Sequence, residues 1–201
     1  MPRSRQETHR RILDAAYSLF HAQGFSRVNV DEVAARAGIT KRTLYDHIRS
    51  KDDLLAEVLE HQSSIALQHT TNWSARSKKD PEGFILALFE DFARWTTKGG
   101  FSGLGFSRVV MELADLPGHP ARKVASRHKA ALEKWLADEL GSRGVKEAGV
   151  MAQQVLMLIE GATLLTVTHG DRTYIRAASE AARVLLMRSI GAFSVRGTAL
   201  R

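Results

Sequence analysis

The sequence predicts an all-α protein of about nine helices. Apolar residues recur at helical spacing along most of the chain, whereas β-branched residues are scattered and form no clean alternation with polar ones. Capping residues and glycines also fall at the ends of the periodic segments. These observations together favour a chain of helices joined by short turns.

The first two predicted helices have recognisable ends. One runs over about 4–22 and ends before Gly24, a residue that tolerates the left-handed conformation. Asn29, followed three residues later by Glu32, is a capping-box pattern and opens a short helix that extends to Ala37.

Two further helices follow directly. Gly38 ends the second helix, and Thr40 can cap a third that runs to about Ile48. Ser50 can cap a fourth helix that continues to about Thr71.

The rest of the chain predicts a loop and five helices. The loop, 73–81, is polar and basic. The predicted helices span about 81–98, 103–116, 119–141, 146–169 and 172–192. The breaks between them are Gly99-Gly100, Pro117-Gly118, Gly141-Ser142 and Gly170-Asp171. No Gly/Ser linker interrupts the chain, so the fourth helix should connect its two parts.

Composition narrows the class of protein. The chain has 201 residues, a formal net charge of +7 and no cysteine, which excludes disulfides, thiolate metal sites and cysteine nucleophiles. Ten Lys/Arg stand against six Asp/Glu in residues 1–52. This favours a polyanionic partner, nucleic acid first, although a solvated basic face is the alternative. The charged start predicts no signal peptide and a cytoplasmic location.

Residues 29–48 predict two short helices joined by a tight glycine turn. Ala34 is small enough to let the second helix cross closely, as in a helix-turn-helix unit. The apolar seam consists of Val33, Ala34, Ala37, Ile39, Leu44 and Ile48. The outward side chains are Thr40, Lys41, Arg42, Thr43, Tyr45 and His47. Such donors at a helix start suit phosphates, and Lys41 or Arg42 could read guanine edges. Two capped surface helices with ordinary polar faces are the alternative.

A longer pattern surrounds this unit. Over about residues 8–60 the chain resembles the tetracycline-repressor (TetR) family of bacterial transcription regulators. The resemblance lies in Val30-Asp31-Glu32-Val33-Ala34, Ala37-Gly38-Ile39-Thr40, Thr43-Leu44-Tyr45-Asp46-His47 and Ser50-Lys51-Asp52-Asp53-Leu54. It implies an N-terminal DNA-binding domain, about 1–50, and a ligand-binding and dimerisation domain, 51–201.

The resemblance also implies roles for single residues. The second helix of the motif would enter the major groove, with phosphates held by Tyr45 and Lys51. Two residues depart from the family pattern: Asn29 stands in place of Thr, and Ile48 in place of Phe. The expected DNA-binding set is Asn29, Thr40, Lys41, Arg42, Thr43, Tyr45, His47 and Lys51.

The C-terminal part carries two long apolar segments. Between residues 150 and 168 only Glu160 is charged, and apolar residues occur all round the helix, which is typical of a buried helix. A membrane span is the alternative, disfavoured by the polar residues of the segment. With the last helix, this segment resembles half of the four-helix dimer bundle of the family. The expected interface residues are Gly161, Ala162, Ala178, Ala182 and Leu185.

A binding pocket is harder to locate from sequence. Aromatic and methionine side chains at helical spacing suit either an effector site or plain core, and His128 and Glu160 are ionisable groups on apolar faces. For Glu160, a salt bridge or hydrogen bond across the dimer is the alternative role. The candidate lining is Phe92, Trp95, Phe106, Met111, His128, Trp135, Met157 and Glu160. It predicts a small hydrophobic effector with one donor or cationic group facing Glu160.

Catalytic and metal signatures are absent from the sequence. There is no Gly-x-Ser-x-Gly motif, and no two of the eight histidines lie three or four residues apart. We therefore expect no enzyme activity, cofactor or metal. The prediction is a homodimeric regulator, a repressor by family resemblance, that binds a near-palindromic double-stranded operator and no membrane. A small-molecule or lipid carrier without operator binding is the alternative.

Overall fold

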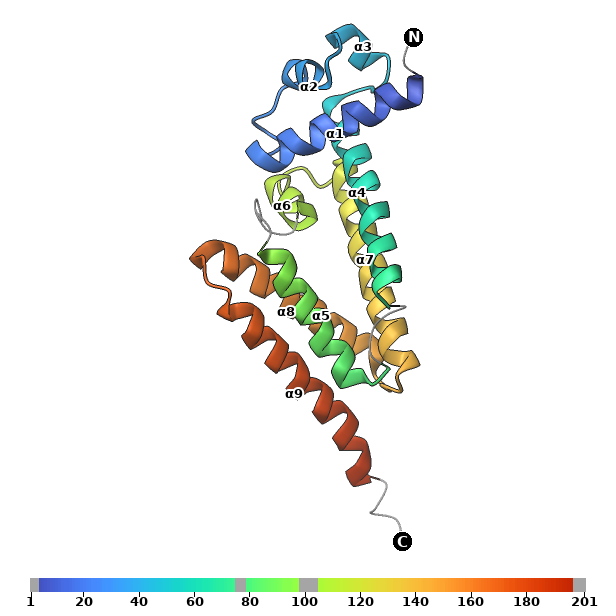
Figure 1. Ribbon diagram of the computed structural model, residues 1–201, viewed down its shortest axis with the longest axis vertical. Helices are drawn as coiled ribbons and strands as arrows, with labels where there is room; N and C mark the ends of the chain where they lie inside the picture. Colours follow the sequence, from blue (N-terminus) through green and yellow to red (C-terminus); the bar gives the residue numbers. More distant parts are fainter. Residues whose placement is uncertain (1–3, 75–78, 98–104, 197–201) are drawn as a thin grey trace. The chain divides into compact units, whose positions relative to one another are not determined.

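The computed structural model describes residues 4–74, 79–97 and 105–196, and these residues form nine helices and no strand (Figure 1). The all-α prediction is thereby confirmed. The helices are α1 (Arg5–Gln23), α2 (Val30–Ala37), α3 (Lys41–Tyr45), α4 (Lys51–Ser74), α5 (Pro81–Thr96), α6 (Gly105–Glu112), α7 (Pro120–Ser142), α8 (Ala148–His169) and α9 (Thr173–Arg196). The predicted break at Gly99-Gly100 lies outside the described residues.

The predicted N-caps of α2 and α3 are made. The side chain of Asn29 accepts a hydrogen bond from the backbone N–H of Glu32 at 2.9 Å and donates to its carboxylate. Thr40 accepts from the backbone N–H of Thr43 at 3.1 Å. Each bond satisfies an N–H that would otherwise lack a helical partner.

Four predicted helix ends were wrong, those of α3, α4, α6 and α9, and α9 continues to Arg196 instead of about residue 192. Helix α3 ends at Tyr45 instead of Ile48, because the carbonyl of Leu44 accepts the N–H groups of both His47 and Ile48 in a closing turn. Helix α6 ends at Glu112 instead of residue 116, because residues 113–115 form turns.

Helix α4 is longer than the sequence predicted. It continues to Ser74, so Trp73 is helical and not part of a loop. The Trp73 ring packs edge-on against Phe84 at 5.2 Å and against Trp135 at 6.0 Å between centroids. Burial of these rings stabilises the extra turn.

The chain divides into two compact units. Unit 1 comprises residues 1–68 and 105–128, and unit 2 comprises 69–104 and 129–201. Both boundaries fall inside helices, so α4 and α7 each continue from one unit into the other. The compact units therefore divide the chain differently from the expected functional domains 1–50 and 51–201, which stay a prediction.

Unit 1 has a core that fixes α2 and α3 against α1 and α4. Leu44 of α3 and Leu54 of α4 are fully buried beside Ile12 of α1. Ile48 is buried in the same core, which also contains the rings of Phe20 and Phe25. The predicted apolar seam is therefore real, and it holds α3 with one face outward.

Unit 2 is built from α5, α8 and α9 with the C-terminal parts of α4 and α7. Phe84 and Ile85 of α5 are buried with Val155 of α8 and Leu186 of α9. Helix α8 packs along α9, and α5 also packs on α9. Small buried residues such as Ala182 permit this close approach.

Candidate functional site

The turn between α2 and α3 requires glycine. Gly38 has φ of +64°, in the left-handed region, and its N–H bonds to the end of α2. A Cβ here would lie 2.8 Å from the guanidinium of Arg11, whose Nη2 donates to the carbonyl of Ala37. The turn is thus fixed by backbone conformation and by a contact from α1, which sets the angle at which α3 is presented.

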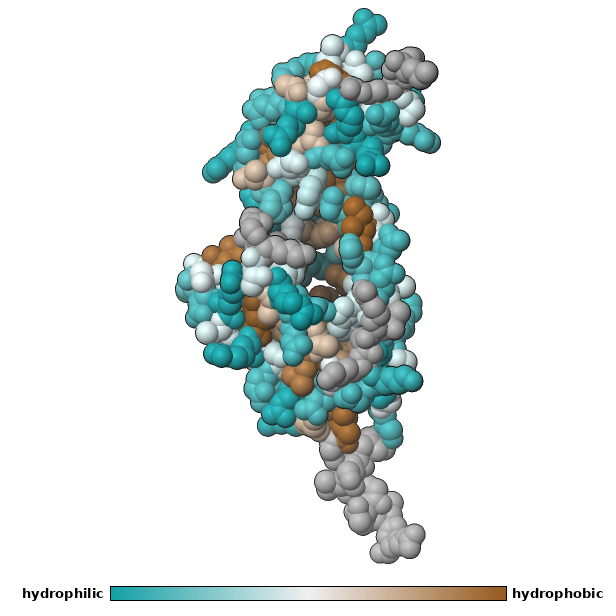
Figure 2. Space-filling model, in the orientation of Figure 1, coloured by the Kyte–Doolittle hydropathy of each residue, from teal (hydrophilic) through white to brown (hydrophobic). Residues whose placement is uncertain are grey.

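The outward face of α3 is open to solvent. Lys41, Arg42 and Tyr45 are exposed, with 47% of the Tyr45 surface accessible. Among the described residues, no hydrogen bond or ion pair engages the side chain of Arg42 or Tyr45. Figure 2 shows mainly hydrophilic side chains over α1, α2 and α3. This face can therefore meet a polar, anionic surface.

The remaining basic groups of the predicted set are partly engaged. Lys41 Nζ lies 3.0 Å from Asp31 in an exposed ion pair. Lys51 Nζ lies over the Phe25 ring, 4.2 Å from its centroid, and burial lowers the pKa of this amine from its ordinary value. Both cations therefore have a partner within unit 1.

The polar residues of the predicted DNA-binding set also make contacts within unit 1. The hydroxyls of Thr40 and Thr43 lie 2.9 Å apart, and the Asn29 side chain is used by its cap, so these residues stabilise the unit itself. His47 lies beside the ring of His9 at 5.9 Å. Burial, followed by the positive charges of Arg5 and His9, lowers the pKa of His47.

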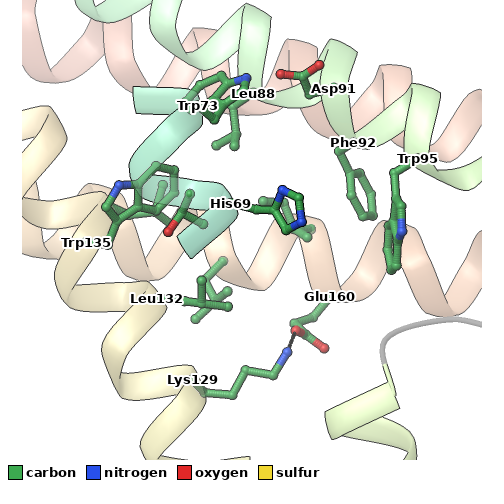
Figure 3. A pocket seen from close by; sticks show the side chains of 14 residues that line it. His69, Trp73, Leu88, Asp91, Phe92, Trp95, Lys129, Leu132, Trp135 and Glu160 are labelled. Carbon is green, nitrogen blue, oxygen red and sulfur yellow. Dashed lines mark hydrogen bonds and ion pairs between the residues drawn. The ribbon is translucent and has the colours of Figure 1, made fainter. Parts of the chain in front are cut away.

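Unit 2 contains a cavity of about 430 Å³, within the usual size range of small-molecule sites (Figure 3). Helices α4, α5, α7 and α8 supply its walls. The lining is mostly apolar and includes the rings of Trp73, Phe92, Trp95 and Trp135. All three tryptophans of the chain therefore line one cavity.

Four of the eight predicted pocket residues line this cavity, namely Phe92, Trp95, Trp135 and Glu160. Glu160 is paired with Lys129 of the same chain, so its salt bridge lies between α7 and α8 within one subunit. The sequence reasoning missed His69, Trp73 and Lys129. The sequence had placed Trp73 in a polar loop after the fourth helix, although its large aromatic side chain was a usable signal.

The other four predicted residues lie elsewhere. Phe106 and His128 belong to unit 1, where their rings stack at 3.8 Å and His128 Nδ1 lies 2.9 Å from the hydroxyl of Ser63. Met111 and Met157 are 66% and 65% exposed on outer helix faces. Helical spacing alone did not show which apolar side chains turn inward.

The residues predicted to form the dimer interface differ in their exposure to solvent. Ala162, Ala178 and Ala182 are buried inside unit 2, where they pack α8 and α9 together, and Leu185 is partly buried there. Gly161 is exposed. Exposed apolar side chains instead form a stripe on α8 and α9. The stripe consists of Val150, Met157, Leu164, Val184, Met187 and Ile190.

Helix α8 is long and apolar enough to span a membrane by length and composition. Its buried residues, among them Val155 and Ala162, pack in the core of unit 2. A core helix of a globular protein passes the same test. In the described ranges, no group of three His, Cys, Asp or Glu residues is arranged to hold a metal ion.

The N-terminal part of the chain, which contains the helix-turn-helix unit, is similar to known proteins. Residues 12–58 match the model of the bacterial regulatory proteins of the tetR family. A stretch of 86 residues is 43% identical to the HTH-type transcriptional regulator SrpR of Pseudomonas putida, and this match covers 42% of the chain and 39% of SrpR.

Other similarities extend over nearly the whole chain. The HTH-type transcriptional regulator YxaF of Bacillus subtilis is 24% identical over 189 residues, which is 92% of this chain and 98% of YxaF. The crystal structure of a TetR-family transcriptional regulator from Streptomyces coelicolor superposes with a TM-score of 0.80 at 23% identity, covering 92% of this chain and 96% of that one. The family consists of regulatory proteins rather than enzymes. The chain belongs to the TetR family of DNA-binding transcriptional regulators.

Proposed function

We propose that this regulator is a cytoplasmic, homodimeric repressor that binds a near-palindromic operator and releases it when a small hydrophobic effector occupies the cavity of unit 2. The observation that supports the proposal best is the pairing, in one chain, of an exposed α3 face with a largely apolar cavity. The carrier alternative explains the cavity alone.

On the DNA side, we assign direct base contact to Arg42 and backbone contact to Tyr45, Lys41 and Lys51. Arg42 is exposed, and its planar guanidinium can donate two hydrogen bonds to a guanine edge. The remaining residues donate to phosphate oxygens, which position the helix without selecting a sequence. We also assign a DNA contact to His47, which lies two residues beyond the end of α3.

The homodimer would form through the apolar stripe of α8 and α9. Leu164 is 54% and Met157 65% exposed in the isolated chain, an arrangement that costs free energy in water unless another surface covers it. Gly161 lies between them on the same face and leaves room for a close helix approach. A twofold contact would hold two α3 helices in fixed register, as a near-palindromic operator requires.

The effector would act through the helices that the units share. Trp73 and His69 of the cavity lie on α4, whose first residue is Lys51, and Lys129 lies on α7, which begins in unit 1. An effector that shifts either helix would change the spacing or tilt of the two α3 helices. The effector can weaken DNA binding by no more than the factor by which it prefers the DNA-releasing conformation over the DNA-binding one.

A direct test is fluorescence anisotropy with labelled DNA from the region upstream of the gene. The proposal expects tight binding that falls steeply with salt and that is weaker and less selective in Arg42→Ala. Lys134→Ala, which removes an exposed cation of α7 in unit 2, should bind like the original chain. A reporter fused to the same region should be more active without the protein. Equal binding to all DNA, or lower reporter activity without the protein, would contradict the proposal.

A further inference from the structure

Aromatic side chains from three helices line the cavity. Trp73 and Trp135 come from α4 and α7, while Phe92 and Trp95 both come from α5, with centroids 5.9 Å apart. In Figure 3 the first pair and the second lie on opposite sides of His69. Aromatic faces contact a planar ring over a large area at little conformational cost.

One end of the cavity is ionic. Lys129 of α7 and Glu160 of α8 form an ion pair there, and their side chains are only 24% and 30% exposed (Figure 3). The third charged lining residue, Asp91, is bound by the guanidinium of Arg94. Each carboxylate that lines the cavity therefore already has a cation beside it.

This pairing decides which head group fits. A cationic ligand would have to compete with Lys129 for Glu160, and an anionic ligand would have to compete with Glu160 for Lys129. Either exchange leaves one partly buried charge without its counter-ion, which is strongly unfavourable. A neutral hydroxyl or amide can accept from the ammonium and donate to the carboxylate while the pair stays intact.

We infer that the cavity selects an uncharged aromatic molecule with one hydrogen-bonding head group, held between Lys129 and Glu160. The sequence alone had left open a donor or a cationic group facing Glu160, and the ion pair with Lys129 removes the reason for the cation. The inference names the effector class of the proposed function and therefore rests on it.

Three probes that share one ring system test this selection by calorimetry: 2-naphthol, 2-naphthoate and 2-naphthylmethylammonium. The expected result is that the neutral naphthol binds at least tenfold more tightly than either ion. Lys129→Met should move the preference to the cation, and Glu160→Gln should move it to the anion. Lys134→Met, which removes a cation from an exposed pair on the same helix, should keep the original order.

The combined exchange Lys129→Glu with Glu160→Lys guards against misfolding of the single variants, because it restores an ion pair and should restore the preference for naphthol. Circular dichroism verifies that each variant is folded. Failure of all three probes to bind, or tighter binding of an ion to the original chain, would overturn the inference. Naphthol binding in the expected order without any change in operator affinity would instead contradict the proposed effector response and leave the cavity chemistry standing.

Discussion

The two units of this molecule differ in how their function is encoded. In unit 1, the outward residues of α3 follow one another in the chain, and a glycine turn with two caps orients them. In unit 2, the cavity lining comes from four helices whose contributions lie up to 91 residues apart, from His69 to Glu160. A local motif can therefore be identified from sequence, whereas a cavity depends on tertiary packing that sequence periodicity does not specify.

Among the variants that test this difference between the units, we expect the largest loss of operator affinity from a charge placed in the apolar stripe of unit 2. Leu164→Arg places a charge on an exposed position of α8, so the chain should still fold, but two copies would bring like charges together. Light scattering at micromolar concentration should report a monomer, and operator affinity should fall by orders of magnitude because two half-sites are no longer held together.

The matched control is Leu116→Arg, at an equally exposed apolar residue in the turn between α6 and α7 of unit 1. It should remain dimeric. A dimeric Leu164→Arg protein would move the interface off α8. Ala182→Arg is unsuitable for this purpose, because Ala182 is 0% exposed within the subunit and a larger side chain would disrupt the core itself.

The next effect concerns the exposed face of unit 1. Arg42→Ala should cost about 1–3 kcal/mol at one base pair and relax the preference there. Lys51→Ala should weaken binding to all sequences alike and reduce the salt slope by about one. Anisotropy titrations on operators with single base changes distinguish the two outcomes. Uniform losses for both variants would mean that Arg42 contacts phosphate only.

A smaller effect tests whether the local motif is as rigid as its geometry indicates. Gly38→Ala would hold a β-carbon at φ of +64° and 2.8 Å from Arg11. The left-handed conformation alone costs about 1–2 kcal/mol for a non-glycine residue. Denaturant unfolding should show the loss, and Gly118→Ala, in the turn before α7, where no atom beyond its chain neighbours lies within 4 Å of the added carbon, should not. Equal midpoints for the two variants would contradict a strained turn.

The sequence predicted the fold and most of the motif for identifiable reasons. Asn29, Thr40 and Gly38 act within four residues of their positions, so their roles could be assigned without tertiary information. The packing contacts of Lys51 and Lys129 could not be predicted that way. Lys51 lies over Phe25, and Lys129 pairs with Glu160, and both contacts form only when distant helices pack. The same reason explains why Met111 and Met157 were wrongly grouped with the cavity aromatics.

The smallest effect is a pH dependence in unit 1. The folded pKa of His47 is lowered from 6.5, chiefly by burial, so folding favours its neutral form. The unfolded chain therefore binds the proton more readily, and stability should decline slightly as pH falls below 6.5 through the lowered pKa. Because this side chain is largely solvated, the decline should be small. Comparing unfolding midpoints of His47→Gln with the original chain at pH 7 and pH 5 measures it, and an identical pH response in both would remove His47 as the cause.

If unit 2 controls unit 1 as we propose, effector binding and operator binding oppose one another. The most direct measurement is calorimetric titration of 2-naphthol into the protein, alone and saturated with operator. Linkage requires operator to weaken naphthol binding by the same factor by which naphthol weakens operator binding. We expect a clear loss of naphthol affinity in the operator complex, matched by the anisotropy result. Tight naphthol binding with identical affinity in both states would contradict it.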